Sequence, residues 1–338
     1  MSEIKKIALK ILSNGKGILA ADESTGTMTK RLDAIKIESN PKSRLKFREA
    51  LFSSSNMKNC IGGVILYDET IRQTSSLKKT IPELISNSGS LPGIKVDTGA
   101  KKLALSNNET ITEGLDGLRD RLKNYYDLGA RFTKWRGVFK IFPEKNLPSI
   151  ESIKANAHAL GRYSALVQEA NMVPIVEPEV LMDGSHDIKT CYQVTKIVLE
   201  ETFYQLSNSN VQLEGIILKP NMILNGSESK IKNETKQVAE MTLSCLKENV
   251  PKEVPGIAFL SGGQNELEAT RNLNEINKIN DTKFIMTYSY GRALQQAALK
   301  FWSKDTSNIS GTQDIFNHRA NMCSLAAQGK WSEELEKK

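Results

Sequence analysis

The feature that most constrains the fold is a short apolar run, rich in β-branched residues, that recurs eight times along the chain. Consecutive runs begin about 30 to 45 residues apart. They span Gly17–Asp22, Ile61–Asp68, Gly93–Asp97, Ala130–Trp135, Val173–Glu177, Glu214–Lys219, Gly256–Leu260 and Phe284–Tyr288. Apolar runs without polar alternation are typical of strands buried on both faces. We therefore predict eight buried strands.

Segments of helical character separate these runs, the clearest being Glu113–Leu128, Ser152–Asn171, Ile188–Leu206, Asn233–Asn249 and Arg292–Phe301. Strands that alternate with helices form parallel sheets with right-handed crossovers, and eight such strands close a barrel. We predict an α/β fold, a single (β/α)8 TIM barrel that forms one domain over residues 1–338. A doubly wound open sheet is the alternative. Such a sheet should carry a glycine-rich nucleotide loop, and neither GxGxxG nor GxxxxGK[ST] occurs.

Two further helices are predicted at the ends of the chain, both packed outside the barrel. Ile4, Ile7, Ala8 and Ile11 recur at helical spacing, and a last helix is expected near Thr312–Gly329. The N-terminal segment lacks a signal-peptide apolar region and cleavage site. No apolar run approaches the roughly 18 residues that span a bilayer. We expect a cytoplasmic protein without a membrane partner.

The composition argues against several function classes. The 46 Lys and Arg residues exceed the 39 Asp and Glu residues by only 7, and no clustered basic tract or zinc-knuckle spacing occurs. A nucleic-acid partner is therefore not expected. The four cysteines form no CxxC pair, which favours reduced, buried thiols over a disulfide framework.

Nearly every run ends in a polar or charged residue. The ends read Asp22-Glu23-Ser24, Asp68-Glu69, Lys95-Val96-Asp97, Lys134-Trp135-Arg136, Glu177-Pro178-Glu179, Lys219-Pro220-Asn221, Ser261-Gly262-Gly263 and Ser289-Tyr290-Gly291-Arg292. In a barrel the carboxyl ends of the strands converge on one mouth, where the active site of such an enzyme lies. A single charged strand end is explained by solvation, but ionisable residues at seven of eight ends are not.

Three lysines in this set limit the chemistry. An uncharged lysine amine in an apolar setting can form a Schiff base with a carbonyl. Lys219 is the best candidate because it follows the apolar residues 215–218. Lys134 stands beside Arg136, and Lys95 beside Asp97, so both are interpreted as electrostatic groups. Lys134 is the candidate cation that favours the neutral form of Lys219.

Two groups of residues are candidate phosphate sites. The loops after the seventh and eighth strands place the amides of Ser261, Gly262 and Gly263 near Ser289, Gly291 and Arg292, where barrels commonly bind phosphate. Ser24, Arg31 and Lys95 form a second basic group after the first and third strands. Two anion sites beside a reactive lysine suggest a small substrate phosphorylated at both ends.

A metal site is not predicted. His158, His186 and His318 lie far apart, none follows a predicted strand, and no HxH or HExxH motif occurs. Each histidine is expected to be a surface residue or a hydrogen-bonded helix residue.

The motifs GILAADESTG, GIKVD, KWR, PIVEPE, LKPNM, FLSGGQ and SYGRALQ, in this order, resemble those of class I fructose-bisphosphate aldolases, which use a Schiff base. The resemblance covers about Lys16 to Lys330. It implies cleavage of fructose 1,6-bisphosphate in glycolysis and gluconeogenesis, no cofactor, and a cytosolic homotetramer.

The resemblance also implies residue roles. Lys219 matches the imine lysine, Glu177 the general acid/base with Glu179 beside it, and Asp22 the group that handles the C4 hydroxyl. The matches to the cations around the imine and the 6-phosphate are Lys134, Arg136 and Lys95, with Ser24, Thr27 and Arg31 at the first basic group. The matches to the 1-phosphate site are Ser261, Gly262, Gly291 and Arg292.

Two departures from the family pattern stand out. Animal members have serine where this chain has Thr27, so a hydroxyl is retained. They also carry a longer C-terminal tail whose last tyrosine assists proton exchange, whereas this sequence ends at Lys338 without it. We expect groups at the barrel mouth to handle that proton.

Three alternatives remain open at this point. The same chemistry could act on sedoheptulose 1,7-bisphosphate, or the chain could be another Schiff-base aldolase such as a transaldolase. A barrel scaffold that binds cytoskeletal or surface partners is the alternative from another class. Buried lysines at strand ends argue against the scaffold, because binding alone does not require them.

Overall fold

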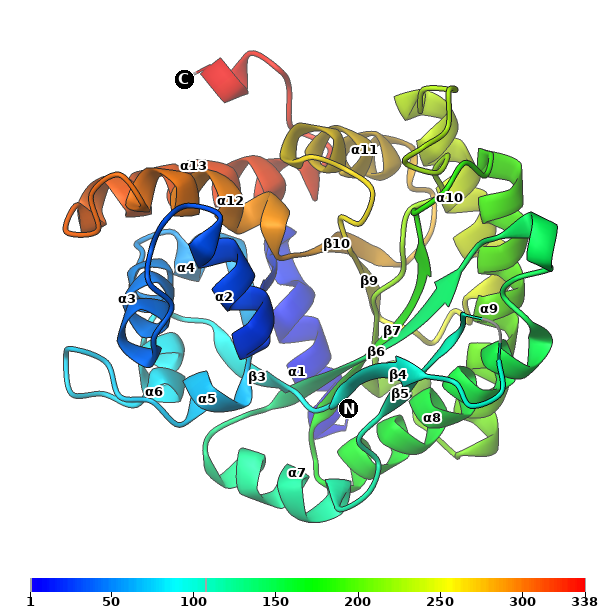
Figure 1. Cartoon of the computed structure of the whole chain (residues 1–338), viewed down its shortest axis with the longest axis horizontal. Coiled ribbons are helices and arrows are strands. Elements are labelled where there is room, and N and C mark those ends of the chain that lie inside the picture. The colour runs from blue at the N-terminus through cyan, green and yellow to red at the C-terminus, as the bar shows by residue number, and fades with distance from the viewer. Residues whose placement is uncertain (1, 107, 338) are drawn as a thin grey trace.

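The computed structural model describes residues 2–106 and 108–337, and its centre is a closed barrel of parallel strands (Figure 1). The strands follow one another around the barrel in the order β1-β10-β9-β8-β7-β6-β3-β2. Their bounds are β1 (Gly17–Ala21), β2 (Ile61–Leu66), β3 (Leu91–Lys95), β6 (Phe132–Lys140), β7 (Val173–Leu181), β8 (Ile217–Leu218), β9 (Gly256–Phe259) and β10 (Ile285–Tyr290). The predicted (β/α)8 barrel is confirmed, and the open sheet is excluded by the pairing of β1 with β10.

Helices surround this barrel (Figure 1). Their bounds are α1 (Glu3–Leu12), α2 (Thr25–Asp33), α3 (Pro41–Phe52), α4 (Met57–Cys60), α5 (Asp68–Ile71), α6 (Ile81–Asn87), α7 (Leu118–Asp127), α8 (Ile150–Glu169), α9 (Ile188–Asn208), α10 (Thr235–Asn249), α11 (Glu266–Ile279), α12 (Arg292–Trp302) and α13 (Ile309–Ala326). Several begin at side-chain caps that the sequence supplies, such as Asn265 with Glu268 at α11. None of the helices in the described part of the chain has the length and apolarity needed to cross a membrane.

The lengths of three strands differ from prediction. β6 and β7 pair residue by residue from Phe132↔Val173 to Lys140↔Leu181, so both continue past their predicted ends. Arg136 and Glu179 therefore lie within strands rather than after them, and Glu177 lies inside β7 rather than at its end. β8 is shorter than predicted, because Leu213–Gly215 forms a 3-10 turn and Pro220 has no N–H group to extend the ladder.

An unpredicted hairpin separates β3 from α7. It consists of β4 (Gly99–Lys102) and β5 (Thr110–Glu113), which pair antiparallel. The predicted helix over Glu113–Leu128 was wrong at its start, since α7 begins at Leu118. Gly114 and Gly117 have φ angles of 125° and 63°, a left-handed backbone that glycine adopts without strain.

The N-terminal helix does not pack among the outer helices as predicted. Ile4, Ala8, Ile11 and Leu12 of α1 pack against inward-facing residues of the barrel, so α1 closes its amino end. The approach is close: a Cβ atom at Gly62 would lie 1.8 Å from the carbonyl oxygen of Ile11. The last helix, α13, does lie outside, where it packs on α11, α12 and α3.

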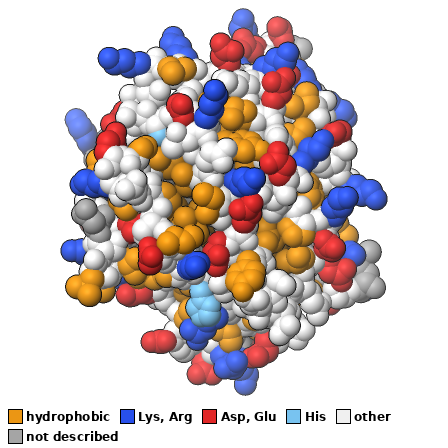
Figure 2. Space-filling model, turned by 90° about the vertical axis from the view of Figure 1, so that its right-hand side faces the viewer, with side chains coloured by type: hydrophobic (Ala, Val, Ile, Leu, Met, Phe, Trp, Pro, Cys, Tyr) orange, Lys and Arg blue, Asp and Glu red, His pale blue; other side chains and the backbone are white. Residues whose placement is uncertain are grey.

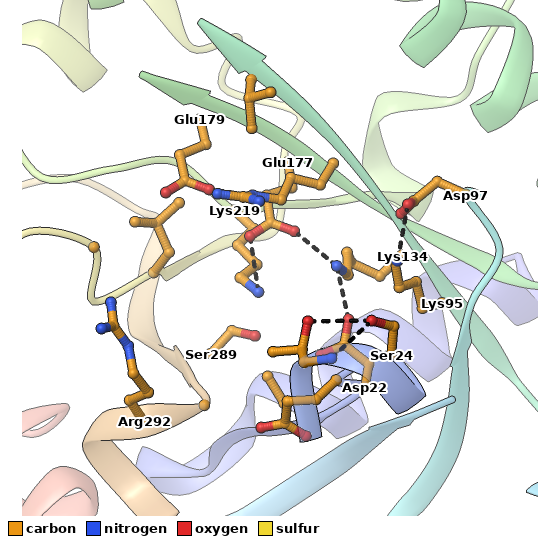
Figure 3. A pocket seen from close by; sticks show the side chains of 18 of the residues that line it. Asp22, Ser24, Lys95, Asp97, Lys134, Glu177, Glu179, Lys219, Ser289 and Arg292 are labelled. Atoms are coloured by element: carbon orange, nitrogen blue, oxygen red, sulfur yellow. Dashed lines mark hydrogen bonds and ion pairs between the residues drawn. The ribbon is translucent and has the colours of Figure 1, made fainter. Parts of the chain in front are cut away.

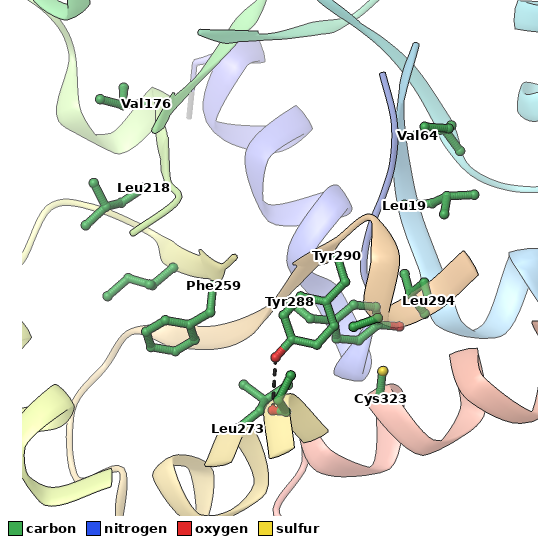
Figure 4. Close-up of a cluster of buried hydrophobic side chains, with 14 of the residues drawn as sticks. Leu19, Val64, Val176, Leu218, Phe259, Leu273, Tyr288, Tyr290, Leu294 and Cys323 are labelled. Carbon is green, nitrogen blue, oxygen red and sulfur yellow. Dashed lines mark hydrogen bonds between the residues drawn. The ribbon is translucent and has the colours of Figure 1, made fainter. Parts of the chain in front are cut away.

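A second core fills the space between the barrel and its outer helices. Val64, Val176, Leu218 and Phe259 point outward from their strands, and side chains of α11, α12 and α13 meet this layer (Figure 4). All four cysteines are buried and free, as predicted. α1 covers the amino end of the barrel and this layer surrounds it, and a cavity opens at the carboxyl ends of the strands.

Candidate active site

A cavity of about 300 Å³ lies at the carboxyl ends of the strands. Its lining includes all five predicted catalytic residues, which are Asp22, Lys134, Glu177, Glu179 and Lys219. The predicted phosphate contacts that also line it are Ser24, Thr27, Arg31, Lys95, Arg136, Ser261, Gly262, Ser289, Gly291 and Arg292. Barrel closure thus brings residues from every part of the sequence to one site.

Lys219 and Glu177 are in direct contact at the floor of the cavity. Nζ of Lys219 lies 3.0 Å from Oε1 of Glu177, and the two side chains are 5% and 4% exposed (Figure 3). Lys219 follows the two-residue strand β8, and Glu177 lies in the neighbouring strand β7. A carboxylate at this distance can take a proton from the amine.

Lys134 lies between two carboxylates. Its Nζ atom is 2.7 Å from Oδ2 of Asp22 and 3.3 Å from Oε2 of Glu177 (Figure 3). Burial alone would lower the pKa of Lys134, but the charges of Asp22 and Glu177 raise it above its ordinary value. Lys134 is therefore a fixed positive charge, and Glu177 stands between it and Lys219.

The same cations keep the carboxylates ionised. Burial alone would raise the pKa of Glu177, but the charges of Lys134, Lys219 and Arg136 hold it below its ordinary value. For Asp22, burial is again opposed by Lys134 and Lys219, and the pKa falls to about 2. Both carboxylates can accept protons at neutral pH.

Glu179 and Arg136 form the outer layer of the cavity. The guanidinium of Arg136 donates a hydrogen bond to Glu179, which is two residues after Glu177 in β7. Burial alone would lower the pKa of Arg136, but the charges of Glu179 and Glu177 raise it. Glu179 lies beside Glu177 (Figure 3), and both side chains line the cavity.

On the hairpin side, Lys95 is held by Asp97. Nζ of Lys95 lies 3.1 Å from Oδ1 of Asp97, and this oxygen also accepts a hydrogen bond from Gly99 N. Asp97 is 3% exposed, whereas Lys95 is 16% exposed and lines the cavity. The arrangement presents the ammonium of Lys95 to the cavity, where it can meet an anion.

The first predicted phosphate group lies at the N-terminus of α2. Ser24 caps this helix by accepting a hydrogen bond from Thr27 N, and its hydroxyl lies 3.1 Å from Thr27 Oγ1. Gly26 has open space where a Cβ atom would stand. Hydroxyls and free amides at a helix N-terminus, with Arg31 nearby, suit an anionic ligand.

Glu23 is a residue that sequence reasoning left out of the site. Its Oε1 atom accepts hydrogen bonds from Arg31 at 2.5 Å and from Gln295 of α12 at 3.1 Å. Glu23 thereby fixes a cavity-lining arginine and ties α2 to α12. Its place beside Asp22 at a strand end was a usable signal for a site residue. The sequence did not show which way the Glu23 side chain points.

The second predicted phosphate group lies at the N-terminus of α12. Gly291 and Arg292 begin this helix, and Ser261 and Gly262 follow β9. Within the described residues, the buried hydroxyl of Ser289 has no hydrogen-bond partner, so it is available to a ligand oxygen. Gly263 departs from the prediction. It lies outside the cavity lining, at a φ of 76°, and turns toward Met182.

The histidines lie apart from this cavity. His158 is on α8 and His318 is on α13, as expected for helix residues. His186 contradicts the expectation, because it is buried after β7 and neither ring nitrogen has a hydrogen-bond partner among the described residues. In residues 2–106 and 108–337, no three His, Cys, Asp or Glu side chains are grouped so as to hold a metal ion.

Comparison with known proteins places this architecture in one family. A family model described as "Fructose-bisphosphate aldolase class-I" matches residues 3–338. A "Probable fructose-bisphosphate aldolase class 1" from Xanthomonas campestris is 48% identical over 332 residues, which cover 98% of this chain and 99% of that protein. A cytosolic fructose-bisphosphate aldolase from Arabidopsis thaliana is 49% identical, with 98% of this chain and 92% of that one covered.

A solved structure is also similar. The fructose-bisphosphate aldolase of Plasmodium falciparum, crystallised with TRAP and a small-molecule inhibitor, superposes with a TM-score of 0.96. Its sequence is 43% identical, and the match covers 98% of this chain and 95% of that chain.

Proposed function

The chain belongs to the class I fructose-bisphosphate aldolase family, and we propose that Lys219 is the residue that forms the Schiff base with the substrate. The family's reaction is the reversible cleavage of fructose 1,6-bisphosphate to dihydroxyacetone phosphate and glyceraldehyde 3-phosphate. One observation carries the assignment. Lys219 Nζ is buried and lies 3.0 Å from Glu177 Oε1, and the other oxygen of Glu177 pairs with the fixed charge of Lys134.

The reaction begins when the ionised Glu177 takes a proton from the Lys219 ammonium, and the freed amine attacks C2 of the open-chain ketose. Glu177 gives this first proton to the C2 oxygen and takes a second proton from the nitrogen of the adduct, which leaves a carbinolamine. Glu177 then gives the second proton to the C2 hydroxyl, which leaves as water. The product is a protonated imine, which draws electrons from the neighbouring carbons.

Carbon–carbon cleavage follows from this electron sink. Asp22 removes the proton of the C4 hydroxyl, the C3–C4 bond breaks, and its electron pair moves into the imine to form an enamine. Glyceraldehyde 3-phosphate leaves. The enamine is protonated at C3, hydrolysis frees Lys219, and dihydroxyacetone phosphate is released. Glu177 and Glu179 are the nearest candidate donors for this proton.

The two phosphates are assigned to the two helix N-termini. Ser24, Thr27, Arg31 and Lys95, with Arg136 above the imine, would receive the 6-phosphate. The 1-phosphate would be bound by Ser261, Gly262, Ser289, Gly291 and Arg292. Helix amides and guanidinium groups are suited to both because they supply hydrogen bonds and positive potential together.

No cofactor is part of this proposal. The imine itself supplies the electron sink, so metal chemistry has no step to perform. We further propose that the protein acts in the cytoplasm, as the name of its cytosolic Arabidopsis relative suggests. Buried free thiols fit that compartment.

We also propose a homotetramer. The face that carries α8, α9 and α10 displays apolar side chains among its charges (Figure 2). In α9, Ile197 and Tyr204 are 43% and 60% exposed. A large exposed apolar patch rimmed by polar side chains marks an interaction surface. Light scattering of the purified protein tests the subunit number, and a monomer or a dimer would contradict the proposal.

Borohydride trapping tests the central assignment. Reduction in the presence of dihydroxyacetone phosphate should attach the three-carbon unit to Lys219 and abolish turnover, and peptide mapping identifies the residue. Label on Lys134 or Lys95 would overturn the assignment. Cleavage assays with fructose and sedoheptulose bisphosphates then rank the two sugars.

A further inference from the structure

The strands that carry Lys219 and Glu177 separate just beyond these residues. The last register pair between β7 and β8 is Val176↔Leu218, followed by one more backbone bond, from Lys219 N to Val176 O at 2.8 Å. Pro178 follows Glu177, and Pro220 follows Lys219. Neither proline has a backbone N–H group. The regular ladder therefore stops at the level of the reacting side chains.

The side chain of Asn221 replaces the missing ladder bond. Its Oδ1 atom accepts a hydrogen bond from Val180 N at 3.1 Å. Val180 directly follows Glu179, and Asn221 lies two residues after Lys219. The bond thus joins the two chain segments immediately beyond the Lys219–Glu177 contact.

The other end of the carboxamide is also fixed. Nδ2 of Asn221 donates to Thr195 Oγ1 of α9 and to Met222 O, both at 3.1 Å. Asn221 is 1% exposed and Thr195 is 2% exposed. Only an amide supplies one acceptor toward Val180 and two donors in the opposite direction, so this network fixes its orientation.

We propose that Asn221 is a positioning residue that holds Glu177 at its working distance from Lys219. The inference rests on the proposed roles of Lys219 and Glu177. Asn221 touches neither side chain. It acts on Glu177 through the backbone of Val180 in β7, and on Lys219 through its own backbone in the segment after β8. Proton transfer at about 3 Å is sensitive to displacement, and a shift of about 1 Å can cost about a hundredfold in rate.

The test compares Asn221→Ala with Asn225→Ala. Asn225 lies in the same loop, is also buried, and also accepts a backbone hydrogen bond, from Ile188 N at 2.8 Å. That bond joins the loop to the start of α9, away from the cavity. Both variants should lose thermal stability, but only Asn221→Ala should slow the chemistry.

The first measurement is the borohydride trapping rate on wild-type protein with dihydroxyacetone phosphate. If label is not on Lys219, the proposed function fails, whatever Asn221 does. With label on Lys219, Asn221→Ala should lower the trapping rate and kcat by roughly tenfold to a hundredfold. KM should change by less than about threefold, because the phosphate-binding residues lie on other loops. Equal kcat and trapping rates in the two alanine variants would overturn the inference.

A milder variant covers the case in which Asn221→Ala does not fold. Thr195→Val removes only one acceptor of the carboxamide and keeps the shape of the side chain. The amide should then be less firmly held, and trapping should slow by roughly threefold to tenfold. An unchanged trapping rate in folded Thr195→Val would overturn the inference.

Discussion

The ammonium of Lys134 lies 2.7 Å from Oδ2 of Asp22, so the middle of β6 is linked to the end of β1 across the floor of the cavity. Asp22 is 13% exposed and Lys134 is 5% exposed. An ion pair this deeply buried is sensitive to the loss of either partner, since the remaining charge is left without compensation.

Replacing Lys134 with methionine should raise the pKa of Asp22. In the wild type, burial is outweighed by Lys134 and Lys219, which lower this pKa from 3.8 to about 2. The attraction of ionised Asp22 to these two lysines stabilises the fold above about pH 4. That contribution is lost as the pH falls toward 2 and Asp22 becomes protonated. In Lys134→Met the loss should begin at higher pH, and the acid limb of kcat/KM should move the same way. Thermal melts and rate profiles from pH 3 to 8 check this, with the exposed Lys236→Met as the control. Identical acid limbs would contradict it.

Glu177→Gln should impair the proton transfers on both sides of imine formation. The amide keeps the size of the side chain but cannot accept a proton from Lys219. We expect kcat to fall by about 10²- to 10⁴-fold, the usual contribution of a general acid or base. Borohydride trapping should slow in parallel. The exposed Glu240→Gln variant is the control and should trap at the wild-type rate. If Glu177→Gln also trapped at that rate, the proton transfer would belong to another group.

Lys219→Arg should retain the positive charge and lose the nucleophile. A guanidinium does not deprotonate near neutral pH, so no imine can form. Activity should fall by at least several orders of magnitude, and reduction with dihydroxyacetone phosphate should leave no label. Lys95→Arg serves as the comparison, because it should raise KM while imine trapping continues. Residual labelling of Lys219→Arg would place the imine elsewhere.

Prolonged treatment with EDTA should leave activity intact. The imine on Lys219 is proposed to supply the electron sink, so chelation removes nothing that the reaction uses. Activity is measured before and after dialysis, with and without added zinc. Inactivation that zinc reverses would show a metal requirement and refute the proposal.

Removing Ser332–Lys338 should reduce stability more than activity. Glu336 accepts hydrogen bonds from Arg319 at 2.5 Å and from Trp331 Nε1 at 2.8 Å, so the segment is held against α13. Its loss leaves the buried guanidinium of Arg319 short of a partner, at a cost of about 1–3 kcal/mol. Cleavage and proton exchange on dihydroxyacetone phosphate should change little. A selective collapse of exchange would show that the segment takes part in the protonation of the enamine.

The period of the apolar runs predicted eight buried parallel strands joined by helices. Runs such as Gly256–Leu260 need burial on both faces, and eight strands are the number that closes a barrel. Closure itself was decided only by the pairing of β1 with β10, which excluded the open sheet. The same rule placed Asp22, Lys95, Lys219 and Ser261 at one mouth, because the carboxyl ends of parallel strands converge. Element type and approximate position are local properties, which a sequence reports directly.

The sequence could not indicate which of these side chains touch. Lys134 was predicted to be the cation that favours the neutral form of Lys219, but the sequence did not show that Glu177 lies between the two amines and pairs with both. Gly263 was placed in the phosphate site, but its loop turns it toward Met182. Asn221 stood out only as a polar residue after a run, and nothing paired it with Val180, which is 41 residues away in sequence. These contacts depend on how far neighbouring strands are staggered when the barrel closes, and that stagger is a property of the whole sheet rather than of any one segment.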